Sequence, residues 1–98
     1  MENTNEMVIE FDSRSCNEGF ARVAVAAFCT QLNPTLEEVA DLKTAVSEAI
    51  TNSIIHAYDE GVHKIRMECK IVDHDLYVTV IDYGKGIEDV AKAMEPLF

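Results

Sequence analysis

Two polar side chains interrupt an apolar stretch of the sequence and could form the edge of a binding site. In AVSEAITNSIIHAY, residues 45–58, Glu48 and Asn52 stand four positions apart among Ala, Val and Ile. At about 100° per residue, both lie roughly 200–240° around the helix axis from Val46, which belongs to the apolar stripe. They therefore share one side of a predicted helix, away from its buried face. Solvent-facing residues are the commoner explanation of this spacing, and the pair alone does not identify the polar edge of a site.

The second candidate is the glycine-containing sequence DYGKG, residues 82–86, at the end of a predicted strand. Gly84 and Gly86 allow positive φ or a close approach of the backbone to a flat ligand. A simple strand-to-helix turn capped by Asp82 would use the same residue types. Combined with Glu48 and Asn52, and with a predicted hairpin between the two elements, the loop indicates a site more strongly than either element alone.

The helix that carries Glu48 is predicted to span residues 35–57. It opens with a capping box, Thr35 followed by Glu38, and Gly61 suits the turn beyond its end. Residues of its apolar stripe recur at helical spacing and should face a sheet: Val39, Leu42, Val46, Ala49, Ile50, Ser53 and Ala57.

An earlier helix is predicted from a second capping box, Ser15 with Glu18, to about Gln31, where the sequence NPT ends it. It is rich in apolar residues at helical spacing, namely Phe20, Val23, Ala24, Ala27 and Phe28. Arg22 is the only cation within it and either faces solvent or contacts an acidic group of a partner.

Alternation of apolar and polar residues predicts strands at 7–11, 65–71 and 76–82, of which the last is apolar on both faces and therefore more central. Residues 87–94 are predicted to form a short helix before Pro96. The expected fold class is α+β, a two-layer sandwich with a mixed or antiparallel sheet and helices on one face. All of it is expected to form a single domain, residues 1–98.

Composition limits the classes of function. The chain has 98 residues and a formal net charge of −10, which disfavours direct binding to nucleic acid. Cys16, Cys29 and Cys69 are widely spaced and are interpreted as small buried hydrophobes of a reduced, cytoplasmic protein. Neither a signal peptide nor a membrane-spanning stretch is predicted.

The combination of the two polar elements resembles the GHKL superfamily of ATP-binding proteins, which includes DNA gyrase and the histidine kinases. The segment 48–52 resembles its N box, and the segment 82–86 resembles its G1 box. The sequences FARVAVAAF, VSEAITNSIIHAY and EPLF are similar to those of the small serine kinases of this superfamily that act as sporulation anti-sigma factors. This resemblance covers essentially the whole chain.

The resemblance implies a role for each polar residue, with ATP or ADP and Mg²⁺ as cofactors. Glu48 would be the catalytic base that draws the proton from a partner serine hydroxyl. Asn52 would be a magnesium ligand, with phosphates and water completing the shell.

The resemblance also implies that Asp82 accepts the adenine amino group and that Gly84 and Gly86 let the loop close over the nucleotide. His56 would lie near the phosphates, unless it is a simple helix-end residue. His63 and His74 are expected in loops, without a functional role.

The function implied is that of a homodimeric anti-sigma factor that sequesters a sporulation sigma factor and phosphorylates an anti-anti-sigma protein on serine. One alternative is a catalytically inactive binding module that only sequesters a sigma factor. Another is the ATP-binding domain of a two-component histidine kinase, which is disfavoured because no phosphoacceptor helix precedes the domain. Neither nucleic acid nor a membrane is expected as a direct partner.

In the family, a lid, a second glycine-rich box and the last strands of the sheet follow EPLF, whereas this sequence ends at Phe98. The chain therefore resembles the N-terminal two-thirds of such a kinase domain. We expect this form to bind nucleotide weakly or not at all, to be inactive as a kinase, and to leave one edge of its sheet open to pairing.

Overall fold

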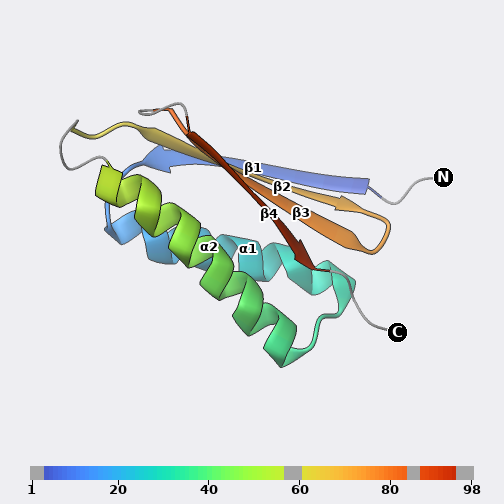
Figure 1. Cartoon of the computed structure of the whole chain (residues 1–98). Helices are drawn as coiled ribbons and strands as arrows, with labels where there is room; N and C mark the ends of the chain where they lie inside the picture. Colours follow the sequence, from blue (N-terminus) through green and yellow to red (C-terminus); the bar gives the residue numbers. More distant parts are fainter. Residues whose placement is uncertain (1–3, 57–60, 84–86, 95–98) are drawn as a thin grey trace.

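A four-stranded antiparallel sheet, covered on one face by two helices, makes up the structure (Figure 1). It is a computed structural model that describes residues 4–56, 61–83 and 87–94. The elements follow one another along the chain as β1 (Thr4–Asp12), α1 (Cys16–Cys29), η1 (Thr30–Leu32), α2 (Leu36–His56), β2 (Lys64–Val72), β3 (Asp75–Asp82) and β4 (Ile87–Met94). The expected two-layer α+β sandwich is confirmed, and its sheet is antiparallel throughout the described strands.

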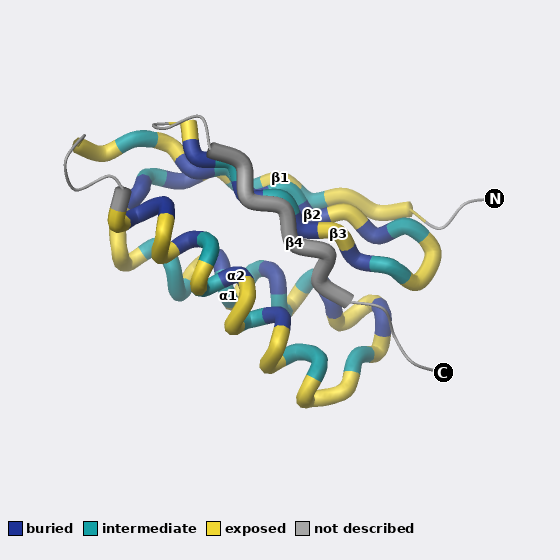
Figure 2. The backbone as a smooth tube through the Cα atoms, viewed as in Figure 1, coloured by how far each residue is buried: buried dark blue, intermediate teal, exposed yellow. Residues whose placement is uncertain are grey.

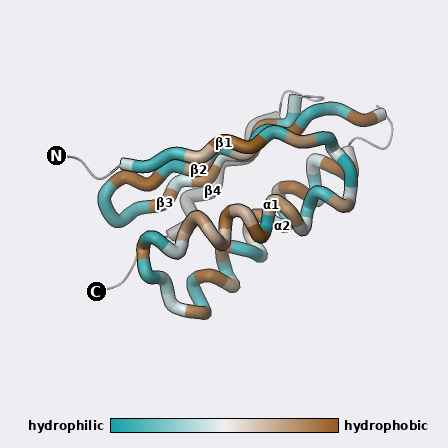
Figure 3. The backbone as a smooth tube through the Cα atoms, turned by 180° about the vertical axis from the view of Figure 1, so that it is seen from behind, coloured by the Kyte–Doolittle hydropathy of each residue, from teal (hydrophilic) through white to brown (hydrophobic). Residues whose placement is uncertain are grey.

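The strands lie in the spatial order β1-β2-β3-β4, so β3 is an inner strand, as its two apolar faces predicted. Their residues alternate in hydropathy along the chain (Figure 3). Because side chains of a strand point to opposite faces in turn, every second residue faces the helices. In β2 the helix-facing set is fully or almost fully buried, and it consists of Ile65, Met67, Cys69 and Ile71.

The expectation for residues 87–94 was wrong, because this segment is strand β4 rather than a helix. It pairs with β3 along its length, from Asp82 opposite Ile87 to Leu76 opposite Met94. A β3 strand with one open edge would leave a row of backbone N–H and C=O groups unpaired. Pairing with β4 satisfies them, and this gain outweighs the modest local helix preference of EDVAKAM. This side of β3 is therefore covered by the chain itself, and β4 is the outer strand there.

The core lies between the sheet and the helices, where the buried segments face one another (Figure 2). The predicted stripe of α2 is confirmed for Leu42, Val46 and Ile50, each at most 1% exposed, and it also includes Ser53 and Ile54. Removing one such aliphatic side chain typically costs about 2–5 kcal/mol, so this stripe fixes the rotation of α2 about its axis. That rotation in turn fixes where Glu48 and Asn52 lie.

The buried face of α1 differs from the expected one. Ala21, Val25 and Cys29 are fully buried, whereas Phe20 and Val23 are more than half exposed. Apolar residues surround this helix on several sides, so periodicity could not identify the side that packs. Small residues at four-residue spacing allow α1 to lie close to its neighbours, which explains the choice of face.

Only one of the two predicted capping boxes forms. At α2, Thr35 N donates to Glu38 Oε1 at 2.8 Å, and Glu38 N donates to Thr35 Oγ1 at 3.1 Å. At α1, Ser15 has helical backbone angles and its side chain makes no capping hydrogen bond. The second expectation was therefore wrong, since a capping side chain must belong to a residue with non-helical φ/ψ.

The sheet face turned away from the helices carries cross-strand ion pairs between β1 and β2. Lys64 Nζ lies 2.8 Å from Asp12 Oδ1, and Arg66 Nη1 lies 3.5 Å from Glu10 Oε2. Hydrogen bonding and charge from Lys64 lower the pKa of Asp12.

In the part of the chain that the structure describes, we find no helix with the length and apolar character needed to cross a membrane.

Candidate functional site

Glu48 and Asn52 lie where the helical count placed them, on an exposed side of α2 away from the core. Together with Ser47 and Thr51 they line an open hollow of about 330 Å³. The pair is thus brought together on one surface, which fits either interpretation of the spacing. The hollow is open to solvent and is lined by residues of α2 alone, so by itself it does not distinguish a site from a solvated helix face.

A second hollow, of about 410 Å³, adjoins the first and extends toward α1. Ser47 and Glu48 line both, and the remaining residues around the second are Arg22, Ala40, Lys43 and Thr44. Two cationic side chains therefore lie near Glu48. Arg22 is 44% exposed and pairs with Glu18 at 3.8 Å, so it faces solvent at the α1–α2 groove.

Asp82 ends β3 and points toward the helices, in line with Val78 and Val80. It is 1% exposed, which is unusual for a carboxylate. Its Oδ1 lies 2.5 Å from Nε2 of His63, whose side chain is 13% exposed. This imidazole is a residue that the sequence analysis missed, since it was expected to have no role.

The signal that would have revealed His63 is the strand alternation itself. His63 stands two residues before Ile65, so it continues the helix-facing series of β2 beyond the start of the strand. Ile65 is directly opposite Asp82 in the register, which makes His63 and Asp82 diagonal neighbours on the same face.

The structure does not bring all predicted site residues into one cavity. Among described residues, Asp82 is not part of the hollow around Glu48 and Asn52. His56 is the last residue of α2, and its side chain lies outside what the structure describes. Gly84 and Gly86 also lie outside the described residues.

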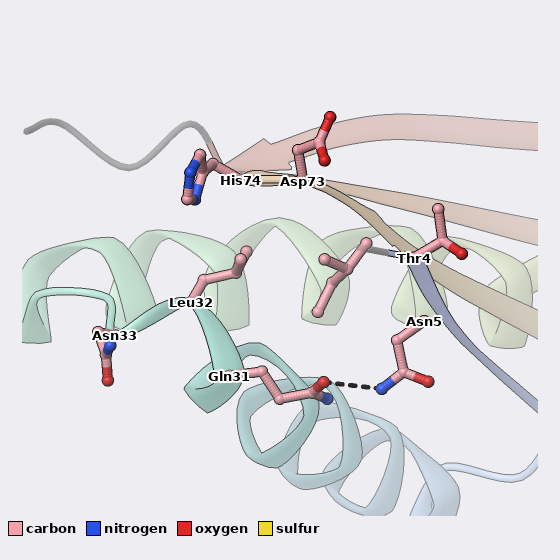
Figure 4. A pocket seen from close by; sticks show the side chains of 8 residues that line it. Thr4, Asn5, Gln31, Leu32, Asn33, Asp73 and His74 are labelled. Carbon is pink, nitrogen blue, oxygen red and sulfur yellow. Dashed lines mark hydrogen bonds between the residues drawn. The ribbon is translucent and has the colours of Figure 1, made fainter. Parts of the chain in front are cut away.

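A larger hollow of about 500 Å³ lies at the other end of the sheet, near the β2–β3 turn (Figure 4). Asn5 Nδ2 donates to Gln31 Oε1 at 2.7 Å across it. None of the predicted site residues is among those that line it: Thr4, Asn5, Gln31, Leu32, Asn33, Ile71, Asp73 and His74. Its volume alone does not make it the functional site.

The cysteines are split between core and surface. Cys29 and Cys69 are buried as expected, whereas Cys16 is exposed at the start of α1. Burial raises the pKa of the Cys69 thiol to about 12 and also raises that of Cys29.

Within the described ranges, no group of three or more His, Cys, Asp or Glu side chains could hold a metal ion.

Comparison with known proteins now adds to this geometry. Residues 12–97 match the family model described as a histidine kinase-like ATPase domain. An anti-sigma F factor of Caldanaerobacter subterraneus subsp. tengcongensis is 58% identical over 98 residues, which are 100% of this chain and 68% of the relative. The chain belongs to the anti-sigma F factor family.

Other members of the anti-sigma F factor family support the assignment. The one from Thermoanaerobacter sp. is 56% identical over 98 residues, which are 100% of this chain and 68% of the relative. The one from Clostridium botulinum is 58% identical over 97 residues, which are 96% of this chain and 66% of the relative. An ATPase domain implies nucleotide binding, and the individual roles of Glu48, Asn52 and Asp82 stay predictions.

Proposed function

We propose that this chain forms the nucleotide-binding region of an anti-sigma factor that is also a serine kinase. The whole protein would bind a sporulation sigma factor and would phosphorylate an anti-anti-sigma protein on serine. The observation that carries the proposal is the position of Glu48 and Asn52 around one hollow of α2, in a chain of the anti-sigma F factor family.

Glu48 is assigned the role of catalytic base. It is exposed at the boundary of two hollows, where a serine hydroxyl of a partner protein can approach it from solvent. A carboxylate within hydrogen-bond reach accepts the hydroxyl proton as the oxygen attacks phosphorus. Phosphoryl transfer depends mainly on positioning and charge neutralisation, so one well-placed base is enough on the protein side.

Asn52 is assigned to Mg²⁺, which would neutralise charge on the phosphates. Its side chain shares the hollow of Glu48, and the described residues offer no cluster of acidic or imidazole ligands that would form a cage. A single amide oxygen fits Mg²⁺, because this ion keeps several waters and takes much of its shell from substrate phosphates. The ion would thus be held jointly by the protein and the nucleotide.

Asp82 is assigned to the adenine amino group, with Gly84 and Gly86 in the loop that follows and His56 near the phosphates. The burial of Asp82 supports this role, because a carboxylate in a site without water accepts a hydrogen bond from a donor group of the ligand and strongly disfavours an acceptor group in the same place. The domain is proposed to comprise residues 1–98.

The proposed partners are proteins. A net charge of −10 suits a basic sigma factor and favours its rapid association. Arg22 is proposed to contact an acidic group of a partner, since it lies on the surface at the mouth of the α1–α2 groove. A homodimer and an anti-anti-sigma protein complete the proposed assembly, in the cytoplasm.

The test is Glu48→Gln in the whole protein, assayed for transfer of radiolabelled phosphate from ATP to the anti-anti-sigma protein. We expect a loss of about 10²–10⁴-fold in rate with the sigma factor still bound, because only the base is removed. Glu37→Gln, an exposed acid in the first turn of the same helix, is the matched control and should transfer normally. Undiminished transfer by Glu48→Gln would show that this residue is not the base, and absence of transfer by the unmodified protein would favour a module that only binds.

Asn52→Ala tests the magnesium role separately. We expect the dependence of nucleotide affinity on Mg²⁺ to disappear while the circular dichroism spectrum stays unchanged, because the residue is exposed and outside the core. Calorimetry with and without the ion measures this, and an unaltered dependence on Mg²⁺ would contradict the assignment.

A further inference from the structure

Each of the two long helices carries a single Lys or Arg, and both of these cations line the same hollow. Within its bounds α1 contains only Arg22, and α2 contains only Lys43. They line the hollow of about 410 Å³ beside Glu48, which lies between two helices, unlike the hollow around Asn52. In a chain with a formal net charge of −10, this local excess of positive charge favours an anionic occupant.

Neither cation is held by a strong ion pair. Lys43 takes part in none of the ion pairs that join the described residues to one another. Arg22 Nη1 lies 3.8 Å from Glu18 Oε1, which is too long for a hydrogen bond, and the Arg22 side chain is 44% exposed. Exposed pairs of this kind contribute little to stability. Both cations can therefore turn toward an anionic group that enters the hollow from solvent.

Ser47 lines both hollows and has an unsatisfied hydroxyl group. Thr44 Oγ1 and Ser53 Oγ donate to backbone carbonyl oxygens four residues earlier in α2, at 3.0 Å and 3.2 Å. Ser47 Oγ is buried without a hydrogen-bond partner in the described part of the chain. A buried hydroxyl left unpaired is costly, so a hydrogen bond to an incoming acceptor group would be favourable. Rotation about one side-chain torsion would turn this hydroxyl toward such a group.

The order of residues along α2 separates the cations from the proposed magnesium ligand. The α2 residues of the two hollows recur at intervals of three and four from Ala40 to Asn52, so they lie on one side of the helix. At a rise of 1.5 Å per residue, Lys43 lies about 7.5 Å before Glu48 along the axis, and Asn52 lies about 6 Å beyond it. The phosphates are proposed at Asn52. The hollow beside Lys43 therefore lies on the opposite side of the proposed base, where the protein substrate approaches.

We propose that the hollow lined by Arg22 and Lys43 binds a carboxylate of the substrate protein close to its acceptor serine, and that Lys43 makes the kinase specific for an acidic acceptor segment. This inference rests on the proposed function, in which Glu48 receives the proton of that serine. An extended chain advances about 3.3 Å per residue, so an offset of about 7.5 Å places the Asp or Glu within about three residues of the serine. Binding of this carboxylate positions the serine hydroxyl at Glu48.

The experiment measures kcat and KM of the whole protein for phosphate transfer from ATP to the anti-anti-sigma protein. Lys43→Gln should raise the KM for the protein substrate about fivefold, with little change in kcat or in the KM for ATP, because docking is weakened while the base and the proposed magnesium ligand remain. Lys70→Gln, on the face of the sheet turned away from the helices, is the matched control and should leave all three constants unchanged.

Variants of the substrate identify the group that Lys43 binds. Replacing the Asp or Glu of the acceptor segment by Asn or Gln should raise the KM of the unmodified kinase by a similar factor, and it should add little to the effect of Lys43→Gln. Lys43→Glu should weaken transfer further through repulsion, and a Lys in place of the substrate acid should restore it. This rescue distinguishes a direct ion pair from a general effect on the helix.

The outcomes separate the inference from the proposed function. An unchanged KM for the protein substrate in Lys43→Gln, with normal transfer by the unmodified protein, would overturn the inference alone. A rise in the KM for ATP instead, or an acceptor segment without Asp or Glu, would also overturn it. If the unmodified protein transfers no phosphate, or if Glu48→Gln transfers it undiminished, the proposed function fails, and the inference fails with it.

Discussion

The capping box of α2 permits a sharp test of how the helix that carries Glu48 and Asn52 is started. Thr35→Ala removes the hydroxyl that accepts from Glu38 N at 3.1 Å, whereas the backbone N–H of residue 35 remains and can still donate to Glu38 Oε1, the bond that measures 2.8 Å in the unmodified chain. Replacing a capping Thr by Ala costs about 1 kcal/mol, within a range of roughly 0.5–2. With a urea m-value of about 1.5 kcal/mol/M, the unfolding midpoint should fall by roughly 0.7 M.

Ser15→Ala is the matched control, because Ser15 occupies the same motif at α1 but makes no side-chain capping bond. We expect its midpoint to change by less than about 0.3 M, the effect of an ordinary surface substitution of under about 0.5 kcal/mol. Urea titration followed by circular dichroism measures both variants. Equal shifts for the two variants, or no shift for Thr35→Ala, would refute the assignment of the two helix starts.

Two further predictions follow from the pKa shifts. At pH 8 a thiol reagent should modify only Cys16 among the three cysteines of the folded protein, because the other two are buried. Burial raises the pKa of the Cys69 thiol to about 12 and also raises that of Cys29. Rapid modification of a second thiol before unfolding would contradict this prediction. The pKa of Asp12 is lowered from 3.8 by Lys64, so the ion pair stabilises the fold above that pH and is lost as pH falls through the lower, folded value. Asp12→Asn should therefore flatten the decline of the urea midpoint between about pH 5 and pH 2, and an equally steep decline would contradict the pairing.

The sequence predicted those elements whose pattern is strong over many residues. The stripe from Leu42 to Ile50 and the alternation from Ile65 to Ile71 each identify one buried face, and both faces were confirmed. A long amphipathic pattern works because only one rotation of the element buries all of its apolar side chains. Helix α1 has apolar residues on several sides, so the pattern could not tell that Ala21 rather than Phe20 is buried.

Strand β4 could not be predicted because its conformation depends on a neighbour. Residues 87–94 have no strong period of their own, and they become a strand through hydrogen bonds to β3. Such non-local pairing overrides local preference when an inner strand would otherwise have an open edge.

The candidate site was predictable only in part. Helical spacing was enough to place Glu48 and Asn52 together, because both belong to one rigid element. The contact between His63 and Asp82 depends on the register of β2 and β3. The alternation of β2 implied that His63 faces the helices, but because His63 was expected in a loop, this contact was not predicted. The distance between the α2 hollow and Asp82 depends on how helix and sheet pack, and no local pattern encodes it.

The most direct test of the nucleotide site is a map of backbone amide NMR shifts as ADP and Mg²⁺ are added to the whole protein. We expect the largest shifts at residues 47–52 of α2 and at Asp82, since these residues are proposed to surround the phosphates and the base. Shifts confined to the hollow between Asn5 and His74, or no shifts at millimolar nucleotide, would contradict the proposed site.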